Sequence, residues 1–162
     1  FFHDVLGRSE VETGLLLTSW PFATALMAVV SGRLADRISP FVLSGLGMAV
    51  FATGLACLAT MPAGPTNIDI CWRLAVCGLG FGVFQTPNNR VMITAAPIER
   101  SGGASGMQST ARLLGQSFGA ALAAIILGMT LQQNLSLAMW ISAGCAGLAG
   151  IIGAFRKSES PA

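Results

Sequence analysis

Arginine side chains that interrupt apolar, otherwise uncharged stretches are the residues best placed to do chemistry in this sequence. Arg73 lies near the start of one such stretch and Arg90 near its end, while Arg112 is the single charge between residues 101 and 155. A guanidinium in apolar surroundings needs an ion partner, a carbonyl or a route to water, and such residues are often functional. Arg73, Arg90 and Arg112 are therefore candidate functional residues, with snorkelling to a polar edge as the alternative for Arg73 and Arg112.

A short charged link supplies the second set of candidates, in which two arginines flank one aspartate. Its residues are Gly32, Arg33, Leu34, Ala35, Asp36 and Arg37, followed by Ile38-Ser39-Pro40. One interpretation is a tight turn with charges that merely fix orientation. The other is that Gly32 ends a helix and Asp36 offers its carboxylate to a neighbouring helix N-terminus or arginine, which would stabilise one conformation.

The sequence shows no pattern typical of a catalytic site, a metal site or a nucleic-acid-binding surface. Four cysteines lie singly in apolar segments without a CxxC pair, and the one histidine, His3, is far from them, so small buried hydrophobes are expected rather than metal ligands. The net charge of +2 and the absence of a basic run argue against a nucleic-acid partner. Because no carboxylate, histidine or cysteine cluster is expected at depth, we predict no enzyme activity and no cofactor.

The elements that position these residues are expected to be helices in lipid. Hydrophobic residues make up 53% of the chain and charged residues only 10%, whereas a water-exposed surface is roughly a quarter to a third charged. Lipid offers no hydrogen bonds to an open backbone, and the alternation typical of barrel strands is missing, so we predict an all-α integral membrane fold.

Uncharged stretches of about 20 residues predict five transmembrane helices. They cover about residues 13–32, 41–61, 70–95, 105–130 and 135–155, with a polar turn at Gln132-Gln133-Asn134 and a cytoplasmic tail at 156–162. Pro21 and Pro87 each remove a backbone donor within a span, which predicts kinks and free carbonyls.

The basic residues gather at one set of helix ends, which predicts the orientation. That set holds Arg33, Arg37, Arg90, Arg100, Arg156 and Lys157, and the opposite set holds Arg8, with Arg73 just inside a span. We therefore expect the first set and the C-terminus to be cytoplasmic, and the N-terminal segment and residues 62–69 to lie outside. The opening residues lack a methionine and a signal-peptide pattern, which indicates the tail of a longer protein.

Glycines and aromatic residues suggest packing faces and a cavity. The pairs Gly78 with Gly82 and Gly115 with Gly119 have the G-x-x-x-G spacing that permits close helix approach. No strand precedes Gly78, so a dinucleotide fingerprint is excluded. Candidate cavity-lining residues for flat, apolar or cationic compounds are Trp20, Phe81, Phe84, Gln85 and Asn88, with lipid contact or helix packing as the alternative for each.

The link at residues 32–37 also resembles a known family. Gly32, Leu34, Ala35, Asp36 and Arg37 match the G-x-L-a-D-r core of the loop signature of the major facilitator superfamily, although Ser39-Pro40 departs from its end. The resemblance implies that the five spans are helices two to six of the C-terminal six-helix half.

Further motifs are similar to the fourteen-span drug:proton antiporters. They are residues 5–9 with Gly14-Leu15-Leu16, and Gly78, Gly80 and Gly82 followed by Gln85, Pro87, Asn88 and Arg90. In this resemblance Arg73 occupies the pseudo-repeat of an arginine associated with proton coupling. The resemblance implies that Arg73, Arg90 and Arg112 are candidate coupling or gating residues.

The resemblance implies a secondary active transporter in a bacterial inner membrane. Its expected activity is proton-coupled efflux of drug-like or cationic amphiphilic compounds by alternating access, together with a missing N-terminal half of the same transporter. The alternatives are a carrier of a metabolite, sugar or siderophore and, more remotely, a membrane scaffold or intramembrane enzyme. Because no carboxylate lies within an expected span, the group that titrates is expected in the missing part.

Overall fold

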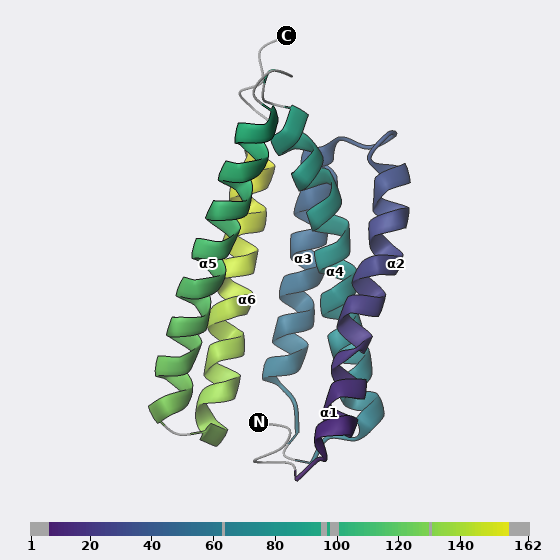
Figure 1. Ribbon diagram of the computed structural model, residues 1–162. Helices are drawn as coiled ribbons and strands as arrows, with labels where there is room; N and C mark the ends of the chain where they lie inside the picture. Colours follow the sequence, from purple (N-terminus) through teal and green to yellow (C-terminus); the bar gives the residue numbers. More distant parts are fainter. Residues whose placement is uncertain (1–6, 63, 95–96, 98–100, 130, 156–162) are drawn as a thin grey trace.

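Six helices make up the computed structural model, which describes residues 7–62, 64–94, 97, 101–129 and 131–155, and side chains within these except at 126–135 and 154–155. The helices are α1 (Glu10–Leu17), α2 (Ser19–Leu34), α3 (Pro40–Ala59), α4 (Asn67–Thr94), α5 (Ser101–Met129) and α6 (Leu131–Phe155). They run up and down along a common direction, and no strand occurs in the described residues (Figure 1). The all-α prediction is confirmed. The predicted tail at 156–162 and the basic residues Arg100, Arg156 and Lys157 lie outside the described residues.

Within the described residues, four helical segments are long and apolar enough to cross a membrane. They are Glu10–Leu34, Pro40–Ala59, Asn67–Thr94 and Ser136–Gly153. These segments coincide with four of the five predicted spans. The fifth prediction coincides with α5, which has 29 residues but contains several serine and glycine residues, a glutamine and Arg112 in its first half.

The first span is interrupted one turn before Pro21. Proline has no N–H to donate to the carbonyl four residues earlier, which here belongs to Leu17. The chain turns at Thr18, whose N–H donates to the Gly14 and Leu15 carbonyls at 3.1 and 3.2 Å, and α2 then begins at Ser19. The predicted kink therefore appears as a division between α1 and α2.

Two boundary predictions are wrong. Gly32 does not end its helix, because α2 continues to Leu34 and the C-cap is Ala35. Residues 132–134 do not form a turn between spans, because α6 already begins at Leu131. Glutamine is a good helix former, so its polarity did not indicate the end of a helix.

Helix α4 lies at the centre of the bundle because its glycines allow two neighbouring helices, α2 and α3, to approach closely. A Cβ at Gly80 would lie 2.7 Å from the Phe51 Cα of α3, and one at Gly82 would lie 2.6 Å from the Thr24 carbonyl of α2. At Gly78 a Cβ would collide with the Trp20 carbonyl. Gly78 and Gly82 therefore face α2, and Gly80 between them faces α3.

The two outer helices, α5 and α6, differ in how closely they pack against the rest of the bundle. Helix α6 packs against α3, and the Ser136 hydroxyl donates to the Ala59 carbonyl at 2.8 Å. Helix α5 stands beside α6 at one side of the bundle (Figure 1), and its described side chains are exposed or half-buried. No described atom lies within 4 Å of a Cβ built on Gly115 or Gly119. The second glycine pair therefore faces open space, unlike the first.

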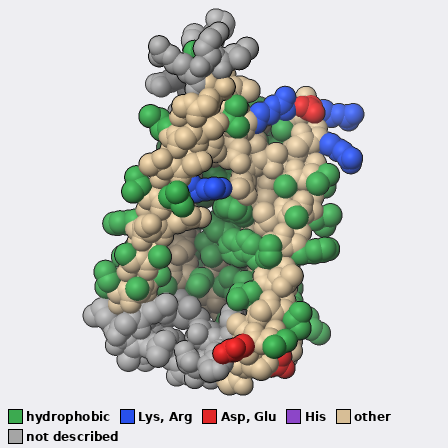
Figure 2. All heavy atoms as spheres, in the orientation of Figure 1, with side chains coloured by type: hydrophobic (Ala, Val, Ile, Leu, Met, Phe, Trp, Pro, Cys, Tyr) green, Lys and Arg blue, Asp and Glu red, His purple; other side chains and the backbone are tan. Residues whose placement is uncertain are grey.

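The two ends of the bundle differ in charge (Figure 2). Basic side chains gather at one end with a carboxylate among them, and acidic side chains lie at the other end. Arg33 is in the last turn of α2, whereas Glu10 and Glu12 are in the first turn of α1 and Asp69 is in the first turn of α4. Between these ends, large hydrophobic side chains are exposed, as expected of a surface whose solvent is lipid.

Candidate functional site

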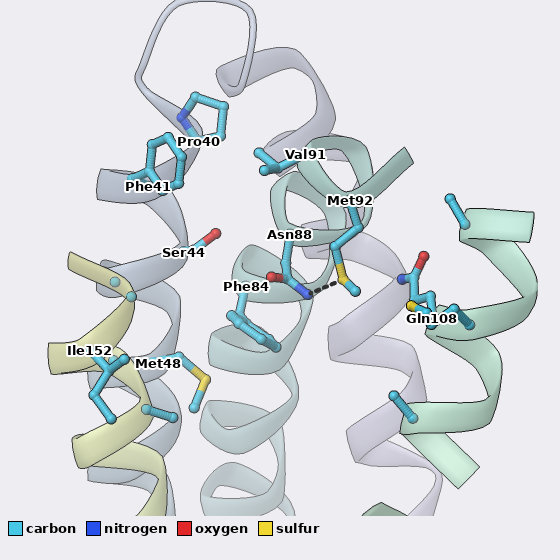
Figure 3. A pocket seen from close by; sticks show the side chains of 17 residues that line it. Pro40, Phe41, Ser44, Met48, Phe84, Asn88, Val91, Met92, Gln108 and Ile152 are labelled. Carbon is cyan, nitrogen blue, oxygen red and sulfur yellow. Dashed lines mark hydrogen bonds between the residues drawn. The ribbon is translucent and has the colours of Figure 1, made fainter. Parts of the chain in front are cut away.

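A cavity of about 700 Å³ opens near the basic end of the bundle, between α3, α4, α5 and α6 (Figure 3). Helix α3 contributes Pro40, Phe41, Ser44, Gly45 and Met48; α4 contributes Phe84, Asn88, Val91 and Met92; α5 contributes Ala104, Met107, Gln108 and Ala111; α6 contributes Ala149, Gly150, Ile152 and Gly153. None of these described lining residues is charged. The volume lies within the range of pockets that hold drug-sized ligands.

A few polar groups interrupt the apolar wall. The Asn88 amide donates to the Met92 sulfur at 3.8 Å, as the dashed line in Figure 3 shows. Beside it, the Gln108 amide of α5 donates to the Asn89 amide oxygen of α4 at 2.5 Å. The cavity is therefore mostly a soft, apolar surface, with amides that can accept or donate one or two hydrogen bonds to a guest.

An aromatic cluster continues from the cavity into the core. The Phe84 ring lies 6.3 Å from the Phe81 ring, which lies 5.8 Å from Phe51 and 6.1 Å from Trp20. Trp20 and Phe51 meet edge to face at 5.7 Å. Such contacts add to the packing of α2, α3 and α4. Among the five predicted cavity residues, Phe84 and Asn88 line the cavity, Trp20 and Phe81 lie behind it in the cluster, and the half-buried Gln85 is not part of its wall.

The charged link places Asp36 against α4. After α2 ends, the Arg37 and Ile38 N–H groups donate to the Leu34 carbonyl and close a turn. The Asp36 carboxylate then lies 2.7 Å from the Arg90 guanidinium, and the two side chains are 65% and 54% exposed. The predicted pairing of Asp36 with an arginine is observed. At that exposure the pair contributes at most about 1 kcal/mol to the stability of the fold.

Arg73 closes the end of α3. Its guanidinium donates to the Cys57 carbonyl at 2.6 Å, and the Thr60 hydroxyl donates to the same carbonyl at 3.1 Å. The usual helical donor, the Met61 N–H, instead donates to the Leu58 carbonyl at 3.2 Å. A cation at a helix C-terminus also interacts favourably with the helix dipole. These contacts support a stabilising role for Arg73.

We expect Arg73→Gln to lower the free energy of unfolding by about 2 kcal/mol, because a hydrogen bond from a charged donor is lost at a helix end. Thermal unfolding in detergent measures the effect. Arg37→Gln is the matched control, since Arg37 is exposed, and it should change stability far less. Equal stability of the two variants would contradict the helix-end role and favour a purely coupling role for Arg73.

The remaining candidates are more scattered. Arg112 is exposed on α5 and, although its neighbour Ala111 lines the cavity, is not itself one of the residues of the cavity wall. Gly32 lies on the side of α2 that faces α4, where a Cβ would be 3.9 Å from the Thr86 methyl. The structure therefore brings Asp36 and Arg90 together but does not bring Arg73 and Arg112 to the same place.

The sequence did not identify several residues that lie at or near the site. Ser31 is 1% exposed and donates to the Val83 carbonyl at 3.0 Å. Met48 and Gln108 line the cavity from α3 and α5. Ser31 could have been found, because a serine in an apolar span needs an acceptor and Pro87 frees one nearby in the bundle.

Comparisons with known proteins agree with this architecture. A family model described as Major Facilitator Superfamily matches residues 1–162. An "Uncharacterized transporter YebQ" from Escherichia coli (strain K12) is 49% identical over 159 residues, which cover 98% of this chain and 35% of that protein. No solved structure shows a significant match.

Two further relatives have names that refer to drug resistance. "Multidrug resistance protein Stp" from Mycobacterium tuberculosis (strain CDC 1551 / Oshkosh) is 30% identical, covering 83% of this chain and 25% of that protein. "Quinolone resistance protein NorB" from Staphylococcus aureus (strain bovine RF122 / ET3-1) is 30% identical, covering 94% of this chain and 34% of that protein. The chain therefore spans about a third or less of the length of these relatives.

Proposed function

This chain belongs to the Major Facilitator Superfamily, and we propose that it forms most of the C-terminal half of a proton-coupled exporter of drug-like or cationic amphiphilic compounds. Members of the family are transporters rather than enzymes, and the apolar helices make this chain an integral membrane protein. The substrate proposal rests on the cavity near the basic end. This chain supplies one wall of the proposed pathway, and the rest of the transporter supplies the other.

The chemistry of the cavity supports an amphiphilic guest. Met48, Met92 and Met107 are flexible and polarisable, so they adapt to guests of different shape. Phe84 offers a ring face to a flat or cationic compound. The uncharged wall gives no fixed counter-ion, so we propose that the carboxylate that exchanges protons lies in the N-terminal half.

The drug-resistance names of two relatives support the same substrate class. A carrier of a sugar or another metabolite is the alternative. Specific recognition of a sugar needs many placed polar groups, whereas the described wall offers mainly the amides of Asn88 and Gln108 and the hydroxyl of Ser44. This contrast favours an amphiphilic compound.

We propose that the basic end is cytoplasmic and the acidic end external, in the cytoplasmic membrane of a bacterium. Arg33, Arg37 and Arg90 lie at one end of α2 to α4, which is the distribution of short cytoplasmic loops. The cavity then opens toward the cytoplasm, from which an exporter takes its substrate. Asp36 and Arg90 form a latch between α2 and α4 at this end.

Everted vesicles that contain the complete transporter test the proposed function. With the lumen acidified, we expect uptake of ethidium that stops when a protonophore dissipates the gradient. Vesicles without the transporter provide the control. Uptake no greater than in the control, for ethidium and for tetraphenylphosphonium, would reject export of amphiphilic cations.

A further inference from the structure

Pro87 leaves a carbonyl of α4 without its helical donor, and a residue of α2 replaces that donor. Proline has no N–H, so the Val83 carbonyl receives no bond from the residue four positions later. The Ser31 hydroxyl donates to this carbonyl at 3.0 Å. Ser31 and Pro87 are both fully buried, in surroundings where an unpaired carbonyl would be costly.

The two helices approach closely enough for this contact because the face of α4 that packs against α2 has glycine residues. Gly82 allows the Thr24 backbone of α2 to approach, and a side chain there would collide with it. The Thr24 hydroxyl also donates to the Gly78 carbonyl at 3.2 Å. The part of α4 before Pro87 is therefore held against α2 by two buried or half-buried hydrogen bonds.

Beyond Pro87 the attachment is of a different kind. Asp36 binds Arg90 through an exposed ion pair at 2.7 Å, which water and salt weaken. Asn89 accepts a hydrogen bond from Gln108 of α5. Asn88, Val91 and Met92 from this same segment line the cavity. A bend of α4 at Pro87 would therefore move one wall of the cavity and leave the first part of α4 in place.

We propose that Pro87 is a hinge in α4 that α2 controls at two points. Ser31 anchors the free carbonyl on the near side of the hinge, and the Asp36–Arg90 pair is a releasable latch on the far side. Release of the latch lets residues 88–94 swing and changes the mouth of the cavity. The consequence for substrate rests on the proposed function, but the hinge itself does not.

Distances between spin labels in the complete transporter test the hinge without substrate or a proton gradient. The native cysteines are replaced, and labels are attached at Val29→Cys in α2 and Ile93→Cys beyond the hinge, both of which are exposed. A second pair, Val29→Cys with Ile68→Cys, reports on α4 before the hinge. Each pair is measured with and without Asp36→Asn, in the Pro87 protein and in Pro87→Ala.

With Pro87 present, we expect Asp36→Asn to shift and broaden the distances of the Val29/Ile93 pair and to leave the Val29/Ile68 pair unchanged. In Pro87→Ala the new N–H can bond the Val83 carbonyl and stiffen the helix, so the same substitution should produce no shift. An equal shift in both backgrounds, no shift in either, or a change at the Val29/Ile68 pair would overturn the hinge. Because no transport is measured, these outcomes are independent of the proposed substrate.

Ser31→Ala gives a second readout. We expect it to broaden the Val29/Ile93 distances when Pro87 is present and to have no effect in Pro87→Ala, where the carbonyl has its own helical donor. This loss of effect is specific to the proposed anchor. Equal broadening in both backgrounds would show that Ser31 acts through packing alone and would contradict its role as the anchor.

Discussion

Replacing Gly80 with valine should prevent the bundle from folding. A Cβ at this position would lie 2.7 Å from the Phe51 Cα and 2.9 Å from the Gly47 carbonyl oxygen, and it would also collide with the Phe51 backbone nitrogen. All three atoms belong to backbone, which cannot rotate away as the end of a side chain can. We expect the separation of α3 and α4 to cost about 3 kcal/mol or more, which is a large part of the stability of a typical domain.

Gly115→Val provides the matched control for this substitution. It makes the same change in side chain and helix propensity in α5, where no described atom lies within 4 Å of the Cβ position. Unfolding in detergent, followed by circular dichroism, compares the two variants. We expect a well-folded control and little or no folded Gly80→Val protein. Similar stability for both would mean that α3 and α4 do not cross at Gly80.

Replacing Ala111 with tryptophan should block transport while the fold is retained. Ala111 lies on α5 in the wall of the cavity and is exposed, so an indole can enter the open space without displacing a packed core. If the cavity forms part of the substrate pathway, as proposed, we expect ethidium uptake to fall by about tenfold or more, which corresponds to about 1.4 kcal/mol.

Ala120→Trp is the control for the blocked cavity. Ala120 is also an exposed alanine of α5 but does not belong to the cavity wall. Uptake into everted vesicles, corrected for the amount of folded transporter, should be close to normal in this variant. Equal activity of the two tryptophan variants would remove the cavity from the transport pathway.

The helices could be predicted because the charges that separate apolar stretches also mark helix ends. Arg33 and Arg37 bracket the end of α2, and Asp69 lies in the first turn of α4. The exact ends depended on local bonds that composition does not reveal. The Leu34 carbonyl accepts from the turn that follows it, so α2 passes through Gly32, and the polar residues at 132–134 were compatible with the start of a helix as well as with a turn.

The site was less predictable because its residues come from helices that are distant in the sequence. Asp36 could be expected to seek an arginine, but nothing local identified Arg90 as the partner, 54 residues away. Phe81 and Phe84 are three positions apart on α4, yet only Phe84 lines the cavity. Phe81 instead packs against Trp20 of α2 and Phe51 of α3, neighbours that a single sequence does not specify.

The two glycine pairs also show that a local pattern does not identify the neighbouring helix. The spacing of Gly78 and Gly82 and that of Gly115 and Gly119 are identical, and both pairs predict close helix approach. In the described residues, α2 lies against the first pair and nothing lies against the second. Spacing identifies a face that can accept a helix, whereas the neighbour depends on how the whole bundle assembles.

The proposed function requires that the basic and acidic ends of the bundle lie in different compartments. Single cysteines at Gly64, in the loop between α3 and α4, and at Arg37, in the loop after α2, test this directly in cysteine-free transporter. A membrane-impermeant maleimide added to intact cells should label the cysteine at position 64, and should label the one at position 37 only after lysis. Equal labelling of both positions in intact cells would show that the two ends do not lie in different compartments and would contradict the proposed orientation.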